Sequence, residues 1–310
     1  MLVLLPPSET KRDGGDPGSR LDLDRLAFPA LTEERRAVVR AVADLARDPE
    51  AAARALKLGP RQAAEVERNR VVESSPTMPA LLRYTGVLYD PIGAAALDAE
   101  QLAFAGRHVA VHSALFGPVA ATDPIPAYRL SHDSRVPGVR MKAHWSASVC
   151  AALAEVPGLV LDLRSEGYAA LGPRPGHADS AVVRVVARGE DGTVRALNHF
   201  NKKAKGELVR ALVRGGRDLG TVAELLEWAR ESGIEPRPRR RRQAGARDRL
   251  PLTRDRPHAA PAVPADRGTS PASEPGPSVA FGPDRSRRDQ AAWWQPTTWS
   301  STSPEDCMSA

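Results

Sequence analysis

A sharp change in composition near residue 235 limits what this chain can fold into. Residues 236–310 open with PRPRRRRQ, then mix Pro, Ala, Ser, Asp and Arg without an apolar period, and contain no lysine. Segments of this kind cannot bury enough apolar surface to offset the entropy of folding. We therefore expect one folded domain over residues 1–235 and a disordered Arg/Pro/Ala-rich tail over residues 236–310.

The excess positive charge of the chain lies mostly in that tail. Thirteen arginines and eight acidic residues follow residue 235, so the tail carries five of the six net charges and the body only about +1. The tail is either a basic arm that touches phosphate backbones or an unselected extension, and the second interpretation is favoured. A nucleic-acid site in the body would have to come from local clustering of cations.

Several classes of protein are disfavoured at once. No apolar run approaches the length of a membrane span, and the opening MLVLLPP lacks the length and basic start of a signal peptide. The two cysteines, Cys150 and Cys307, are far apart and outside any metal-ligand spacing. They favour a reducing compartment, hence the cytoplasm, over a disulfide scaffold or a zinc site. We expect no membrane partner, no metal and no cofactor.

Strand patterns and helix patterns alternate along residues 1–235. Short apolar or alternating runs predict strands, and apolar residues at helical spacing with capping signals predict helices. The expected strands cover residues 2–5, 108–113, 159–163, 181–187 and 194–200, the last two as a hairpin. The expected helices cover residues 32–47, 51–56, 61–69, 98–105, 141–156, 203–213 and 221–232. This mixture indicates a single domain of the α/β (α+β) class.

Half of the lysines gather in the segment HFNKKAKG, residues 199–206. The chain has only six, at Lys11, Lys57, Lys142, Lys202, Lys203 and Lys205. We expect this segment to follow a strand and enter a helix, so that backbone N–H and ammonium groups converge on an anion. The anion could be a phosphate, a nucleotide or a nucleic-acid backbone. The alternative is a solvated helix start without a ligand.

Acidic and hydroxyl side chains follow the strand expected at residues 159–163. They are Asp162, Ser165, Glu166 and Tyr168. Asp162 and Glu166 are candidates for a general acid and base, although an ion pair with a nearby lysine is the favoured role.

Ser113 ends another expected strand and is a third catalytic candidate. The G-x-S-x-G elbow is absent, which argues against an α/β-hydrolase, and neither a P-loop nor a G-x-G-x-x-G motif occurs. Tyr128, Arg129 and Trp145 suit a polar groove with aromatic edges. The histidines are too scattered to predict a metal site.

The segment ARALKLGPRQAAEVERNR, residues 53–70, places a tight Leu58-Gly59-Pro60 turn between two short helices. A helix–hairpin–helix offers backbone N–H groups to a DNA phosphate and reads no sequence. An ordinary turn between two helices has the same pattern and stays open.

Taken in chain order, these segments resemble one bacterial family. The segments are MLVLLPPSETK at 1–11, YTGVLY at 84–89, HSALFGP at 112–118, YRL at 128–130, Trp145, LDLRSEGY at 161–168 and FNKKAKG at 200–206. Over residues 1 to about 215 they are similar to the YaaA-type peroxide-stress proteins. The ordered set is far more specific than any single segment.

The resemblance implies a single α/β domain of the fold called cantaloupe, with a helix–hairpin–helix at about residues 50–70 and a positively charged cleft. It implies cytoplasmic binding of duplex DNA without marked sequence preference. It also implies a role in limiting free intracellular iron and oxidative damage under hydroperoxide stress. On this sequence the cations of the cleft would be Lys11, Arg129, Lys142, Lys202, Lys203 and Lys205. Its other residues would be Ser8, Glu9, Ser113, Tyr128, Trp145, Ser165, Tyr168 and Asn201.

Three functions stay open at this point. The favoured one is a DNA-binding stress protein that does no chemistry. The second is an enzyme acting on a nucleotide, a nucleobase or another phosphorylated small molecule. In it Glu166 or Asp162 is the acid/base, Lys202 and Lys203 hold the anion, and Ser113 and Tyr168 orient the substrate. The third is a plain structural or interaction domain.

The tail also marks a departure from the family pattern. Members of the family usually continue after the last helix with apolar strand sequence, whereas this chain turns into arginine-rich low complexity at about residue 236. A missing closing strand would leave a sheet edge uncovered. We expect the tail to be an extension without a structural role.

Overall fold

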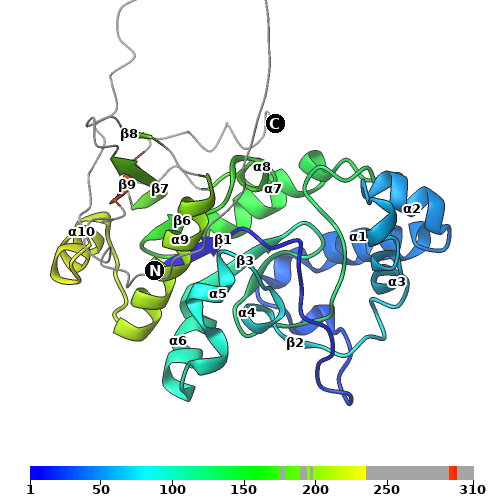
Figure 1. Ribbon diagram of the computed structural model, residues 1–310, viewed down its shortest axis with the longest axis horizontal. Helices are drawn as coiled ribbons and strands as arrows, with labels where there is room; N and C mark the ends of the chain where they lie inside the picture. The colour runs from blue at the N-terminus through cyan, green and yellow to red at the C-terminus, as the bar shows by residue number, and fades with distance from the viewer. Residues whose placement is uncertain (175–178, 189–193, 196–197, 235–292, 299–310) are drawn as a thin grey trace, which may run out of the picture. The chain divides into compact units, whose positions relative to one another are not determined.

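The computed structural model describes residues 1–174, 179–188, 194–195, 198–234 and 293–298 (Figure 1). All of them belong to one of the two units of the chain, which comprises Met1–Arg241 and Ala292–Ala310. The second unit, Arg242–Ala291, lies outside the described residues.

A mixed sheet forms the centre of the domain, in the order β4-β3-β1-β6-β7-β8, with β9 also pairing β7. Strands β3, β1, β6 and β7 run parallel, and β4, β8 and β9 pair antiparallel to their neighbours. The main strands are β1 (Leu2–Leu5), β3 (Val109–Ser113), β4 (Gly117–Ala120), β6 (Val160–Asp162), β7 (Ser180–Arg188), β8 (Val194–Arg195) and β9 (Trp293–Thr298). A separate two-stranded sheet pairs β2 (Met78–Pro79) with β5 (Pro124–Ile125).

The central strand β1 lies between β3 and β6, and every one of its residues is buried. Its continuous apolar sequence, LVLL, is what a parallel strand covered on both faces requires. The chain moves from β1 to β3 in one direction across the sheet and from β3 to β6 in the other. Right-handed crossovers then place α6 and α7 on opposite faces of the sheet. Because the strand order reverses at β1, its carboxyl end is the switch point of the sheet.

Helices surround the sheet. They are α1 (Thr32–Leu45), α2 (Pro49–Ala55), α3 (Glu65–Arg70), α4 (Ala80–Arg83), α5 (Tyr89–Ile92), α6 (Ala99–His108), α7 (Met141–Ala154), α8 (Glu166–Ala169), α9 (Asn198–Gly215) and α10 (Val222–Glu231). The short 3-10 helices are η1 (Leu23–Arg25), η2 (Pro29–Leu31), η3 (Pro60–Gln62) and η4 (Ala94–Ala96). Helix α6 contacts β1, β3 and α9, and α9 contacts β7. No helix of the described residues is long and apolar enough to cross a membrane.

The α/β class expected from the sequence is confirmed, and two expectations need correction. The HFNKKAKG segment does not leave a strand, because α9 already begins at Asn198 and β8 ends at Arg195. The tail is not wholly without structure: Trp293–Thr298 form β9, which pairs with residues 181–186 of β7 and covers its edge. Pro296 is compatible with such an edge strand, since proline lacks the N–H of a central one. The rest of residues 236–310 lies outside the described residues.

A buried arginine joins α1 to the β3–β4 hairpin. The Arg35 side chain is fully buried and donates to the carbonyl oxygens of Phe116 (2.8 Å), Pro118 (2.9 Å) and Ala27 (2.6 Å). Burial lowers the pKa of its guanidinium to about 10. The guanidinium therefore supplies hydrogen-bond donors to the β3–β4 hairpin, where chain reversal leaves carbonyl groups without ladder partners.

Replacing Arg35 tests this role. Arg35→Met keeps an extended side chain but leaves two buried carbonyls and one part-buried carbonyl without this donor, and we expect the free energy of unfolding to fall by about 3–5 kcal/mol. Urea denaturation measures it. Arg40→Ala, on the exposed side of the same helix, is the control and should change stability by no more than about 0.5 kcal/mol. A loss below about 1 kcal/mol for Arg35→Met would contradict this account.

Removing the tail tests the contribution of β9. A chain ending at residue 235 loses the partner of β7 along six registered positions. We expect it to stay folded with its Tm lowered by about 5 °C, because each cross-strand pair contributes only a fraction of a kcal/mol. Differential scanning calorimetry gives the value. An unchanged Tm would mean that β9 adds nothing, and loss of the fold would mean that it is indispensable.

Candidate functional site

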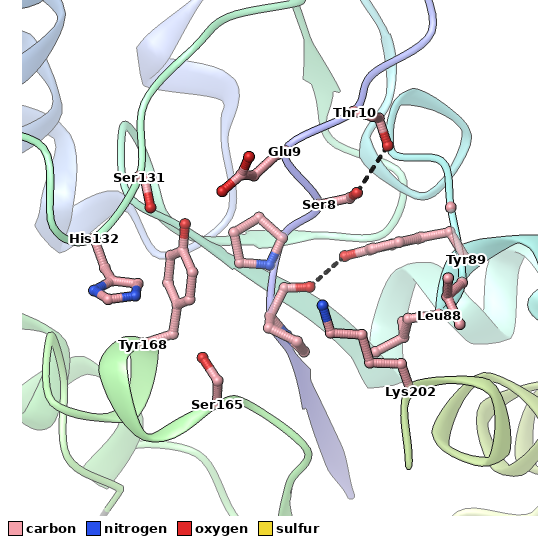
Figure 2. Close-up of a pocket in the computed structure, with 14 residues that line it drawn as sticks. Ser8, Glu9, Thr10, Leu88, Tyr89, Ser131, His132, Ser165, Tyr168 and Lys202 are labelled. Atoms are coloured by element: carbon pink, nitrogen blue, oxygen red, sulfur yellow. Dashed lines mark hydrogen bonds between the residues drawn. The ribbon is translucent and has the colours of Figure 1, made fainter. Parts of the chain in front are cut away.

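A cavity of about 590 Å³ lies at the carboxyl ends of β1 and β6, at the switch point of the sheet (Figure 2). Open α/β sheets commonly bind ligands at this point, because diverging connections leave a crevice there. Five segments distant in the sequence line it. The lining residues are Pro6, Pro7, Ser8, Glu9, Thr10, Gly86, Val87, Leu88, Tyr89, Ser131, His132, Ser165, Tyr168 and Lys202.

The loop after β1 forms one wall of the cavity and is held by side chains from other elements. Tyr89 of α5 donates its hydroxyl to the Pro6 carbonyl at 2.7 Å. Arg129 binds the Glu9 carboxylate at 2.8 Å. These contacts fix the path of the backbone, so this wall is already formed without a ligand.

Lys11 fastens the same loop from behind. Its ammonium donates to the carbonyls of Ser8 (3.0 Å) and Glu9 (3.3 Å) and lies 4.2 Å from the ring centroid of Tyr128. Burial, with a smaller effect of Arg129, lowers the Lys11 pKa to about 7. Lys11 is therefore a part of the scaffold and not the phosphate ligand expected from the sequence.

A chain of buried hydroxyls lies beside Lys11. Ser113 Oγ is 2.7 Å from the Tyr128 hydroxyl, which is 2.8 Å from that of Tyr84. The same Oγ accepts the backbone N–H groups of Leu115 and Phe116. Ser113 and Tyr128 are fully buried, so neither lines the cavity and Ser113 is not placed as a nucleophile.

Asp162 is committed to a buried ion pair. Both of its carboxylate oxygens accept from the Arg164 guanidinium, at 2.9 and 2.7 Å. Burial would raise its pKa, but Arg164 outweighs this and holds the pKa below the usual range. Arg164 also contacts His112 Nδ1 at 2.6 Å, and burial together with Arg164 lowers the His112 pKa. Asp162 is therefore not placed as a general acid, and it pairs with an arginine instead of a lysine.

The six expected cations do not gather in one cleft. Lys202 lines the cavity, while Lys203 is exposed and pairs with Glu207 at 3.8 Å. Lys205 is buried and donates to the Leu163 carbonyl at 2.9 Å. Arg129, also buried, binds Glu9 and Glu65. Lys142 is exposed at the start of α7 and does not line the cavity.

The remaining predicted residues divide in the same way. Ser8, Glu9, Ser165 and Tyr168 line the cavity, whereas Glu166 is exposed on α8 and does not. Trp145 is fully buried and donates to the Ala114 carbonyl at 3.0 Å. Asn201 Oδ1 is buried and has no hydrogen-bond partner among the described residues.

Sequence reasoning missed one side of the cavity. Ser131 and His132 directly follow the YRL segment at residues 128–130, and Gly86–Leu88 lie inside the YTGVLY segment. Both segments carried the family resemblance, which was the available signal. The imidazole of His132 lies edge-on to the Tyr168 ring, 5.0 Å between centroids.

The predicted hairpin is a turn between α2 and α3 that contains η3. Lys57 has a positive φ of 56°, and its ammonium is 2.5 Å from an oxygen of Asp133. Gly59, Pro60 and Arg61 are exposed, and Leu58 is half-buried. The Gly59 N–H already donates to Gln62 Oε1 at 3.2 Å, so it is not a free donor.

The described residues include candidate metal ligands and one of the two cysteines. Among the described residues no group of His, Cys, Asp and Glu could hold a metal ion. Cys150 is buried on α7. Cys307 lies outside the described residues.

Lys11 predicts a pH dependence of stability. Its pKa is about 7 in the folded chain and near 10.5 when unfolded, so over that window the unfolded chain binds more protons and stability rises with pH. Between pH 7 and 9 we expect Lys11 to add about 2 kcal/mol to the free energy of unfolding. Urea denaturation at both values, for the native chain and Lys11→Met, measures the difference. Equal pH dependence in the two proteins would contradict it.

The chain matches known proteins over its folded part. Residues 1–233 match the family model described as peroxide stress protein YaaA. A UPF0246 protein of Corynebacterium glutamicum is 42% identical over 240 residues, which is 76% of this chain and 94% of that protein. A UPF0246 protein of Streptomyces coelicolor is 42% identical over 241 residues, 76% of this chain and 91% of its own length. The chain therefore belongs to the YaaA family of peroxide stress proteins.

Proposed function

We propose that this chain acts in the cytoplasmic response to peroxide by binding duplex DNA without sequence preference and shielding it from oxidative damage. The observation that carries the proposal is the exposed turn between α2 and α3. Residues 59–61 and 63–64 are exposed on this turn, between two short helices. A short exposed turn of this kind suits contact with a phosphate backbone, which positions a protein but carries no base sequence.

The charge around the turn supports the same assignment. Lys57 and Arg61 are exposed on it, and Arg54 adds a cation from the end of α2, paired to Glu50 at a loose 3.7 Å. Each cation that reaches a phosphate releases bound counterions, which is the main source of non-specific affinity. Because the Gly59 N–H is engaged by Gln62, the side chains supply most of this binding.

The proposal includes limitation of free iron only as an indirect effect. The described residues contain no cluster of His, Cys, Asp and Glu that could bind iron. A protein that covers DNA reduces the damage done by iron-generated radicals without holding the metal. Tight stoichiometric binding of Fe²⁺ in a calorimetric titration would contradict this part.

Removing the two turn cations should weaken DNA binding in a salt-dependent way. For Lys57→Ala/Arg61→Ala in the full chain, we expect the slope of log K against log salt to become shallower by about 1 for each phosphate that the protein no longer neutralises. Fluorescence anisotropy with duplexes of two unrelated sequences, at several salt concentrations, measures the slope. Both sequences should give the same result.

A control that removes a single charge elsewhere separates this site from general electrostatics. Arg217→Ala removes an exposed arginine that lies after α9 and pairs with Glu231. It should leave the slope within error of the native chain. If Arg217→Ala and the turn variants weakened binding equally for each charge removed, the hairpin would not be the DNA-binding site.

A further inference from the structure

We propose that the cavity at the carboxyl ends of β1 and β6 binds a nucleoside monophosphate, with the phosphate at Lys202 and Ser165 and the base against Tyr168 and His132. This site is separate from the turn between α2 and α3 and does not depend on the DNA-binding proposal. The nucleotide is either free in solution or the 5′-phosphorylated end of a DNA strand.

The position and size of the cavity support a small ligand. It lies where the strand order reverses, and its volume of about 590 Å³ falls in the range of small-molecule sites. The wall built from the loop after β1 is already fixed by Lys11, Tyr89 and Arg129. A rigid wall lowers the entropy cost of ordering the site on binding.

Charge favours the phosphate at one end of the cavity. Lys202 makes no ion pair with any residue that the structure describes, and its side chain extends toward the loop after β1 (Figure 2). Ser165 lines the same cavity and offers a hydroxyl donor. In the view of Figure 2, the Glu9 carboxylate lies toward Ser131 and away from Lys202. An anion is therefore attracted to Lys202 and kept from Glu9.

The other end offers a surface for a flat ring. The Tyr168 ring and the His132 imidazole meet edge-on, 5.0 Å between centroids. Tyr168 is buried, and its ring also lies edge-on to that of His112, 6.4 Å between centroids, so packing holds the ring in place. Aromatic faces stack on any base. The Glu9 carboxylate can accept a hydrogen bond from the amino group that most bases carry.

The binding test uses the full chain and three probes, AMP, adenosine and inorganic phosphate, followed by isothermal titration calorimetry. If both ends of the cavity contribute, AMP binds at least about tenfold more tightly than either fragment. Phosphate binding as tightly as AMP would remove the base from the proposal. Absence of AMP binding up to about 1 mM would overturn the proposal.

Two neighbouring lysines provide a matched pair of variants. Lys202→Ala should weaken AMP binding by about tenfold and leave adenosine binding unchanged. Lys203→Ala removes a neighbouring exposed cation that does not line the cavity, and it should stay within about twofold of the native chain. Equal losses in the two variants would show general charge attraction and overturn the site. Because both side chains are exposed, neither change threatens the fold.

Two further arms locate the source of the nucleotide. An oligonucleotide with a 5′-phosphate that displaces AMP, when the same oligonucleotide without the phosphate does not, assigns the site to a DNA end. Displacement by AMP alone assigns it to a free nucleotide. Lys57→Ala/Arg61→Ala should leave AMP binding unchanged, so failure of the DNA-binding proposal and failure of this one are told apart.

Discussion

Everything at the site depends on how the chain leaves β1. A parallel strand buried on both faces must end in a loop whose carbonyl groups no longer have ladder partners, and buried carbonyls require donors. Here Tyr89 supplies one for Pro6, and Lys11 supplies one for Ser8 and Glu9. The shape of the cavity follows from these bonds, because the loop that they fix is its wall.

The need of buried carbonyl groups for donors also explains why the cation clusters in the sequence gave a wrong prediction of the site. Buried cations in this body mostly serve backbone carbonyls: Arg35 serves the β3–β4 hairpin, Arg83 the carbonyls of Arg12, Gly14, Pro76 and Ile125, and Lys205 the end of β6. Cations used in this way are desolvated and already paired, so they are not available to a phosphate. A lysine cluster in the sequence is therefore a weaker sign of an anion site than its charge suggests, since burial divides its members.

The fold was more predictable than the site because its signals are local. The apolar run of β1, the amphipathic pattern of α1 and the alternation of β3 each identify an element from a few consecutive residues. The errors arose where context outweighed pattern. Helix α9 begins five residues earlier than expected, so the segment before Lys203 is helical and not a strand. Strand β9 forms in a low-complexity tail because the edge of β7 offers partners that the tail sequence does not announce.

The two candidate binding sites differ for the same physical reason. The turn between α2 and α3 is built from residues 49–70, so its glycine, proline and cations are visible as one motif. The cavity collects residues from five distant segments, and no spacing in the sequence places His132 beside Tyr168. Local patterns had singled out Lys202, Ser165 and Tyr168, while Ser8 and Glu9 were named as site residues through the family resemblance. Arg129 connects the two regions, since its guanidinium binds Glu65 of α3 and Glu9 of the cavity wall. An ion pair between elements far apart in the sequence depends on the packed structure and has no local sequence pattern. For this reason we expected Arg129 to bind a ligand, whereas in the structure it binds two carboxylates.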